Sequence, residues 1–189
     1  MPDSFFKKIL LGFWEVVKVV AVSLAIILPV RYFLIQPFFV IGASMEPNFS
    51  GGNYLIIDEL SYLCVRQRCV GDPSRGEVII FKYPLNPKEY YIKRIIGLPG
   101  ETVIVKGGKV ILKNINNPEG FILDELAYFN GYTGKDKEIT LKEKEYFVLG
   151  DNRDISSDSR TWGAVPRDLI VGKAWIRVFP FSNFQVFSR

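Results

Sequence analysis

The chain has 189 residues, of which 48% are hydrophobic and 14% aromatic, and its formal net charge is +4. These apolar side chains suffice to bury a core, which excludes a wholly disordered chain. The basic residues are scattered instead of gathered along one helix, so no nucleic-acid partner is expected, and the positive charge points to a membrane surface.

The N-terminal segment predicts a membrane anchor. No charged residue occurs in Val19–Val30, and apolar residues continue beyond it. A helix over about Trp14–Ile35 has the length of a transmembrane span if Lys18 and Arg31 extend toward the two headgroup layers. Pro37 is expected to end the helix.

The predicted organisation is therefore a cytoplasmic N-terminus with its anchor over 1–37 and an extracytoplasmic domain over 38–189. Three lysines, at positions 7, 8 and 18, lie on the N-terminal side of the uncharged run Val19–Val30, whereas only Arg31 lies on its other side before Arg66. Because cytoplasmic flanks carry excess positive charge, the N-terminus is expected in the cytoplasm. A cleavable signal peptide is the alternative, but no Ala-x-Ala site closely follows the apolar core, which favours a retained single-pass anchor.

Beyond residue 38 the sequence predicts a mainly β, antiparallel domain. Short runs rich in β-branched and aromatic residues are bounded by turn residues, and no long helical period separates them. Two alternating runs joined by Gly107-Gly108 predict a β-hairpin over Thr102–Leu112, because glycine tolerates the positive φ of a primed turn. Residues 116–138 are expected to form a loop or small cap. The other predicted strands are Asn53–Asp58, Glu77–Tyr83, Tyr90–Gly97, Tyr146–Asp151 and one or two within Asp168–Phe179.

Cys64 and Cys69 are the only cysteines, and the chain has no histidine. Two thiols alone do not complete a tetrahedral zinc site, and neither a metal nor another cofactor is expected. A disulfide that closes this short loop and a pair of free thiols are both open alternatives. The disulfide would suit a domain outside the cytoplasm.

Ser44 lies in a stretch, GASMEP, that is bounded by glycine and proline. A serine hydroxyl becomes a nucleophile when a base takes its proton, and histidine, the usual base, is missing. A lysine serves instead when burial lowers its pKa. Lys82, Lys93 and Lys173 each lie within a predicted apolar strand, whereas Arg94 is excluded because a guanidinium stays protonated. The pattern alone does not choose among the three lysines.

Four stretches together resemble the conserved boxes of bacterial type I signal peptidases, in the order of that family. They are GASMEP, RGEVIIFKYP, YIKRIIGLPGETV and GDNRDISSDSRTWGAVP, and they extend from Gly42 to Pro166. The resemblance implies a membrane-anchored serine endopeptidase that removes N-terminal signal peptides from exported preproteins. It also implies a Ser–Lys dyad on an antiparallel β-rich fold of the signal-peptidase type.

The resemblance assigns roles to individual residues. Ser44 matches the nucleophile, and Lys93 matches the general base. Ser156 matches a serine that hydrogen-bonds to the lysine and orients it. Asp158 and Arg160 match a supporting ion pair beside the site.

The same match implies a substrate pocket for small residues one and three positions before the cut. Bulky walls would exclude large side chains sterically. For Phe38, Val40 and Ile92, simple packing in the core is the alternative interpretation. The predicted walls are Phe38, Val40, Met45, Tyr91 and Ile92.

Two positions depart from the family pattern. Gly42 stands where some members carry a serine that stabilises the oxyanion, so this stabilisation is expected from backbone N–H groups, chiefly that of Ser44. Ile155 stands where asparagine is usual, and no role follows from that change.

Two other functions fit parts of the pattern. A Ser–Lys autoprotease of the repressor-cleaving type shares the dyad, but it carries a DNA-binding module where this chain has an apolar segment. A non-catalytic β domain that binds peptide would tolerate the loss of Ser44.

The aromatic run Trp175–Phe187 is expected either to pack in the sheet or to contact lipid. The preferred prediction is a monomer whose partners are preprotein signal peptides and membrane lipid.

Overall fold

The structure is a computed structural model that divides into two compact units, Met1–Gln36 and Pro37–Arg189. The backbone is described for residues 2–33, 36–65, 68–129 and 131–187. Side chains are described for residues 11–27, 36–63, 69–129 and 131–187.

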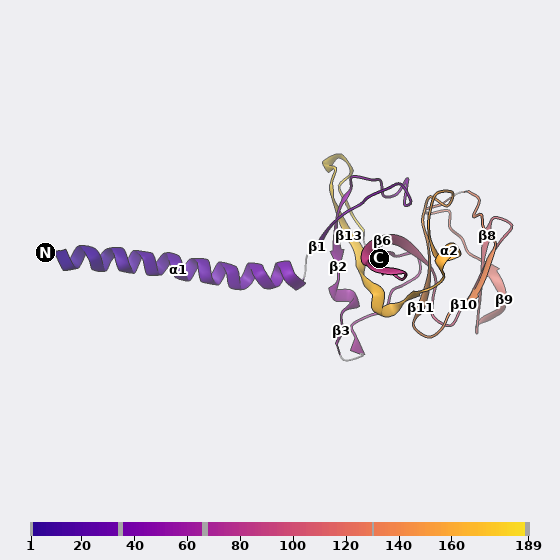
Figure 1. Cartoon of the computed structure of the whole chain (residues 1–189), viewed down its shortest axis with the longest axis horizontal. Helices are drawn as coiled ribbons and strands as arrows, with labels where there is room; N and C mark the ends of the chain where they lie inside the picture. Colours follow the sequence, from indigo (N-terminus) through magenta and orange to yellow (C-terminus); the bar gives the residue numbers. More distant parts are fainter. Residues whose placement is uncertain (1, 34–35, 66–67, 130, 188–189) are drawn as a thin grey trace. The chain divides into compact units, whose positions relative to one another are not determined.

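The first unit contains one helix, α1 (Pro2–Phe33), drawn in indigo in Figure 1. Its described side chains, from residue 11 to residue 27, are all exposed, and Lys18 pairs with Glu15 at 2.9 Å. Residues 34–35, where the predicted anchor ends, lie outside the described residues. Within the described part of the chain, no helix has both the length and the apolar character of a membrane span.

The second unit is built on antiparallel β-sheets, which confirms the predicted fold class. The strands of its largest sheet are β1 (Gln36–Phe39), β2 (Tyr54–Asp58), β5 (Val78–Tyr83), β6 (Asn86–Gly97), β11 (Glu145–Leu149), β12 (Val165–Pro166), β13 (Ile170–Phe179) and β14 (Gln185–Val186). They follow the order β1-β2-β13-β5-β6-β11-β12, and β14 pairs with β13. The strand β6 pairs with β5 along most of its length but with β11 only over Arg94–Gly97. The other edge of its first half is therefore free of described strand partners.

A second sheet has the order β10-β7-β8-β9. Its strands are β7 (Thr102–Lys106), β8 (Lys109–Asn114), β9 (Asn117–Ile122) and β10 (Lys137–Thr140). The predicted hairpin is present, and Gly107 and Gly108 turn it with φ of +57° and +80°. Residues 116–138, expected to form a loop or cap, include the edge strand β9 and the start of β10. The described residues between these two strands belong to no helix or strand, so the expectation was wrong only at the two ends of the segment. Pro118 fits in β9 because an edge strand tolerates a residue without an N–H.

Several short elements connect the sheets. The ladder between β3 and β4 sets Cys69 directly opposite Cys64, and Cys69 is disulfide-bonded, so the disulfide alternative is the one found. The short elements are β3 (Cys64–Val65), β4 (Arg68–Cys69), η1 (Leu60–Tyr62), α2 (Ser159–Trp162), η2 (Arg167–Leu169) and η3 (Phe181–Asn183).

Three clusters of buried apolar side chains hold the second unit together, and β6 contributes to all of them. Ile92 packs against the first cluster, Ile95 belongs to the second and Ile96 to the third. In Figure 1 the strands β8, β9 and β10 lie on one side of β11 and α2, and β2, β6 and β13 lie on the other. A side chain on β6 is therefore well placed to be buried, even when it is polar.

Candidate active site

The turn that carries Ser44 is tied to its neighbours by backbone hydrogen bonds. The amide of Val40 donates to the carbonyl of Asn53 at 2.9 Å, and Gly52 donates to the carbonyl of Val40 at 3.0 Å, which closes the base of the turn. The amide of Asn152 donates to the carbonyl of Ser44 at 3.1 Å. The backbone of Ser44 is thus fixed both to its own turn and to the segment that follows β11.

Lys93, on β6, places its amine against the Ser44 hydroxyl. The Nζ atom of Lys93 hydrogen-bonds to Oγ of Ser44 at 2.7 Å and donates to the carbonyl of Ile92 at 2.9 Å. Only 4% of Lys93 is exposed. A buried amine in direct contact with a hydroxyl is the geometry that proton transfer between them requires.

The surroundings of Lys93 favour its neutral form. Burial lowers the pKa of Lys93 from 10.5 to about 8, because a buried ammonium loses its hydration. The carboxylates of Asp158 and Asp151 act in the opposite direction. Each of them is paired with an arginine, Asp158 with Arg160 at 2.8 Å and Asp151 with Arg94 at 2.6 Å. Near pH 8 a substantial fraction of the amine is therefore able to accept a proton.

The other two candidate lysines do not contact Ser44. Lys173 lies on β13 and its Nζ pairs with Glu77 at 3.4 Å. Lys82 lies half-buried on β5, where its register partner is Tyr90. Of the three lysines that the sequence left open, Lys93 is the one that hydrogen-bonds to Ser44.

The segment 150–160, which follows β11, lies beside the site and is held in place by Asp158. Asp158 caps α2 by accepting from the amide of Arg160 and also accepts from the amide of Gly150 at 3.1 Å. The side chains of Asp158 and Arg160 form an ion pair that is fully shielded from solvent. A capping carboxylate that also holds the first residue of the segment fixes its two ends to each other.

A second buried ion pair joins this segment to residues 123–136. Arg153 pairs with Glu125 at 2.5 Å and donates to the carbonyl of Gly150 at 2.8 Å. Its guanidinium lies 4.1 Å from the ring centre of Phe129. Sequence reasoning missed Glu125, because its segment was expected to be a loop or cap. The one available signal was the acidic pair Asp124-Glu125 within the otherwise apolar run FILDELAYF.

Ser156 differs from the sequence expectation. Its Oγ atom is buried and has no hydrogen-bond partner among the described residues, so the expected bond to Lys93 is not formed. The Lys93 amine donates instead to the carbonyl of Ile92. Ser156 nevertheless lies beside the site, since a Cβ built on Gly150 would lie 2.2 Å from Oγ of Ser156 and 2.4 Å from the carbonyl oxygen of Ser44.

Gly150 therefore gives a testable prediction. In Gly150→Ala the new methyl group would overlap both the Ser156 side chain and the Ser44 carbonyl. We expect the free energy of unfolding to fall by about 1–3 kcal/mol, the usual cost of overpacking, together with a loss of activity because Ser44 is displaced. Denaturant unfolding and a turnover assay measure the two effects. The control is Gly76→Ala: its φ of +85° adds strain, but nothing lies within 4 Å of the new Cβ, so activity should persist. Equal activities in the two variants would contradict the prediction.

A cleft of about 580 Å³ opens beside Ser44 and Lys93. Four of the five predicted wall residues line it, namely Phe38, Val40, Tyr91 and Ile92. Met45 does not, because its side chain points into the first core cluster and is only 1% exposed. Sequence reasoning missed other wall residues, since a cleft between strands far apart in sequence has no local pattern. These additional wall residues are Phe39, Ile41, Leu55, Ile80, Glu89, Tyr90, Ile155 and Ser157.

Ile155 and Gly42, the two departures from the family pattern, both lie in the wall of this cleft. Ile155 is 61% exposed, so it adds apolar surface that a ligand can contact. Gly42 has a φ of +86°, which favours glycine over other residues. Among the described residues no acceptor takes the amide N–H of Ser44, which leaves that donor available to a ligand.

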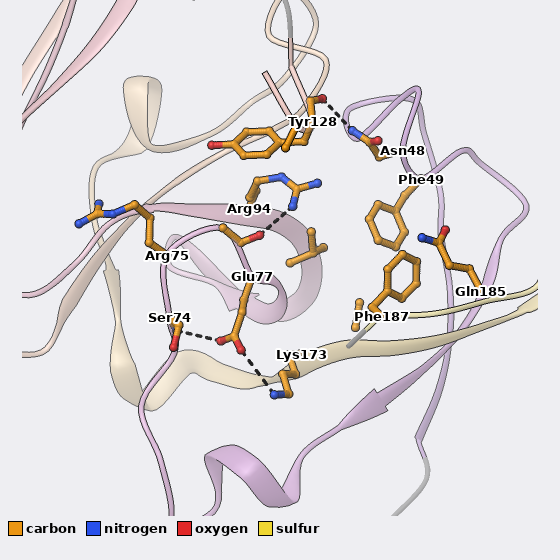
Figure 2. A pocket seen from close by; sticks show the side chains of 14 residues that line it. Asn48, Phe49, Ser74, Arg75, Glu77, Arg94, Tyr128, Lys173, Gln185 and Phe187 are labelled. Atoms are coloured by element: carbon orange, nitrogen blue, oxygen red, sulfur yellow. Dashed lines mark hydrogen bonds and ion pairs between the residues drawn. The ribbon is translucent and has the colours of Figure 1, made fainter. Parts of the chain in front are cut away.

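A larger cavity of about 660 Å³ lies elsewhere in the second unit and contains neither Ser44 nor Lys93. Figure 2 shows the guanidinium of Arg94 beneath the ring of Tyr128, and Lys173 beside Glu77. The charged groups in its wall are paired with protein carboxylates or, for Glu77, with Lys173. The cavity thus lacks a nucleophile paired with a base, and the smaller cleft is the candidate active site.

Comparisons with known proteins show to which family the chain belongs. The family model described as "Signal peptidase, peptidase S26" matches residues 13–179. A protein named signal peptidase I from Pseudomonas aeruginosa is 32% identical over 88% of this chain and 74% of its own length. Signal peptidase IB from Staphylococcus aureus is 32% identical over 88% of this chain and 89% of its own length. The crystal structure of a signal peptidase I from Enterococcus faecalis matches 54% of this chain and 96% of that chain, with a TM-score of 0.41 and 32% identity.

The fold and the matches together define a β-rich peptidase. More narrowly, the chain belongs to the signal peptidase family, peptidase S26, and is a signal peptidase I enzyme. The resemblance that the four sequence boxes indicated is thereby confirmed.

Proposed function

We propose that this chain is a membrane-anchored endopeptidase that removes N-terminal signal peptides from exported preproteins, with Ser44 as nucleophile and Lys93 as general base. The observation that carries the proposal is the 2.7 Å contact between a buried amine and the Ser44 hydroxyl in the wall of a cleft. Membership of the signal peptidase family and the names of the relatives support the substrate class.

Each proton in the proposed reaction passes through Lys93. The neutral amine takes the Ser44 proton while Oγ attacks the carbonyl carbon of the scissile peptide bond. The resulting ammonium gives this proton to the departing amine, leaving an acyl ester on Ser44. A water molecule then gives a proton to Lys93 and attacks the ester, and the ammonium returns the proton to Oγ as the ester bond breaks.

The groups around the dyad have supporting roles in this proposal. The free amide N–H of Ser44 donates to the oxyanion, and Gly42 leaves room for it. Ser156 accepts a hydrogen bond from the Lys93 ammonium as it forms, since its buried Oγ has no other partner among the described residues. Asp158 and Arg160 hold the segment that carries Ser156.

We propose that the substrate binds as an extended chain between β1 and the free edge of β6, because both strands supply walls of the cleft. Residues one and three positions before the cut face the walls formed by Phe38, Val40, Tyr91 and Ile92. These bulky walls leave space only for small side chains.

We also propose a location for the enzyme. Residues 1–37 form the cytoplasmic N-terminus and the anchor, and residues 38–189 act on the extracytoplasmic side of the cell membrane as a monomer. The lysines that precede the apolar segment support this orientation. The exposed aromatic side chains after residue 175 support contact with lipid.

Cleavage of a preprotein tests the proposal. We expect the full chain in neutral detergent to cut a preprotein that has alanine one and three positions before the cut, with many turnovers per enzyme. A matched preprotein with phenylalanine one position before the cut should react about 100-fold more slowly, because the wall residues exclude the ring. Product termini and initial rates are measured by mass spectrometry. Equal rates for both substrates, or cleavage of the enzyme alone, would contradict the proposal.

A further inference from the structure

Arg177, on β13, carries a buried charge that no carboxylate of the described residues neutralises. Only 8% of the residue is exposed, and it forms no ion pair with the described residues. A buried charge without a partner lowers the stability of the fold, and an anionic ligand would offset this cost. The other buried arginines of the described chain each have a carboxylate partner: Arg153 with Glu125, Arg160 with Asp158 and Arg167 with Asp72.

The described groups that contact the Arg177 guanidinium are all neutral. Its Nη1 donates to the carbonyl of Asn48 at 3.0 Å and to Oδ1 of Asn53 at 3.3 Å, and its Nη2 donates to Oε1 of Gln185. The rings of Phe49 and Phe187 each lie 5.4 Å from it. The Nε–H has no acceptor among the described residues, and only one of the two Nη2 hydrogens is used. The site thus keeps a full positive charge and spare donors.

Arg177 lines a pocket of about 350 Å³, which we call the Arg177 pocket. The side chains of Asn183 and Gln185 add amide groups to its wall, and none of the described residues that line it carries a carboxylate. Because Oε1 of Gln185 accepts from Arg177, the amide nitrogen of Gln185 is left to donate elsewhere. A guanidinium combined with amide donors is a chemistry that binds phosphate oxygens.

Exposed aromatic side chains either line the Arg177 pocket or lie near its residues in sequence. Phe184 belongs to the pocket wall and is 60% exposed, and Phe181, on η3, is 82% exposed. Phe179, at the end of β13, is about half exposed. Exposed aromatic side chains near an anion-binding group match the boundary between lipid headgroups and acyl chains.

We propose that the Arg177 pocket binds the phosphate of an anionic phospholipid, while Phe181 and Phe184 contact its acyl chains. The phosphate supplies the negative charge that Arg177 lacks and accepts from the amides of Asn183 and Gln185. The pocket contains no residue of the candidate active site, so its ligand is separate from the peptide substrate.

A lipid titration of the full chain in neutral detergent tests the proposal without using peptidase activity. Dihexanoyl phosphatidylglycerol is added, and the NMR shifts of the backbone amides of residues 183–185 report binding. We expect saturable binding that Arg177→Met weakens about tenfold or more. Lys106→Met, which removes one exposed charge from β7, is the matched control and should bind like the unmodified chain. Equal affinity in Arg177→Met and in the unmodified chain would overturn the proposal.

A second variant and two further ligands keep the result interpretable. Asn183→Leu lies on an exposed turn, so it should fold normally but bind several-fold more weakly; unchanged affinity would count against the pocket. Glycerophosphoglycerol, the same headgroup without acyl chains, should bind much more weakly than the lipid. Equal affinity for it would overturn the lipid assignment in favour of a soluble phosphate. Equal affinity for neutral dihexanoylglycerol would overturn the role of the phosphate.

Discussion

Replacement of Ser44 by alanine is expected to lower kcat for preprotein cleavage by about 10⁴- to 10⁶-fold, because no acyl ester can then form. KM should change little, since the walls of the cleft are untouched. The fold should persist, because the backbone hydrogen bonds of this turn do not use the Ser44 side chain. Initial rates on a preprotein and thermal unfolding of the variant measure both expectations.

The matched control for Ser44→Ala is Ser182→Ala, which alters an exposed serine on η3, away from the cleft. That variant should keep normal turnover. Retention of more than a tenth of the activity in Ser44→Ala would show that another group is the nucleophile. It would also favour a peptide-binding role for the domain over a catalytic one.

Replacement of Lys93 by methionine is expected to have two opposite effects. The rate should fall by about 10³-fold or more, because the base is lost while the shape of the side chain is largely kept. Stability should increase, because the folded chain no longer buries a charged amine. A pKa lowered from 10.5 to about 8 corresponds to a cost of about 3 kcal/mol for keeping the ammonium in the folded state. Loss of the hydrogen bond to Ile92 offsets about 1 kcal/mol of that gain.

The stability gain of Lys93→Met should depend on pH in a defined direction. Between pH 8 and 10.5 the unfolded chain still holds the Lys93 proton that the folded chain has lost, so the stability of the unmodified chain rises with pH across this window. Below pH 8 both states are protonated and the full cost remains. The advantage of Lys93→Met is therefore largest at pH 7 and disappears toward pH 10.5.

Denaturant unfolding of Lys93→Met and the unmodified chain at pH 7 and pH 10 measures this difference. Lys82→Met is the matched control, because Lys82 is half-buried and remote from Ser44; it should keep its activity and show no comparable gain. If Lys93→Met is inactive but has the same free energy of unfolding as the unmodified chain at both pH values, burial of this amine has no cost in the folded chain.

Much of the overall fold could be predicted from the sequence, because the patterns that indicate its strands and its hairpin are local. Alternating apolar runs predicted the strands β2, β5, β7, β8 and β11, and two adjacent glycines predicted the hairpin. The edge strand β9 was not found, since a strand with few buried side chains has no alternating pattern. The segment 116–138 was expected to be a loop or cap because it is rich in glycine, asparagine and charged residues.

The candidate active site could be predicted from the sequence only in part. The alternation of apolar residues could not decide between Lys93 and Arg94 as the base, because both faces of β6 are apolar. Lys93 was preferred because the guanidinium of arginine stays protonated and cannot accept a proton. The hydrogen bond between Lys93 and Ser44 joins β6 to a turn about fifty residues away in sequence, a contact that no local pattern reports. The position of Met45 in the core is likewise a tertiary result, since a residue next to the nucleophile in sequence can point away from the cleft.

The central claim is that the Lys93 amine is neutral often enough near physiological pH to take the Ser44 proton. A ¹⁵N NMR titration of Nζ in the full, detergent-solubilised chain measures this directly. The account predicts a midpoint near pH 8 for Lys93, well below the value of 10.5 for a lysine in water. A midpoint at 10.5 or higher would contradict it, because the amine would then stay charged and could not act as the base.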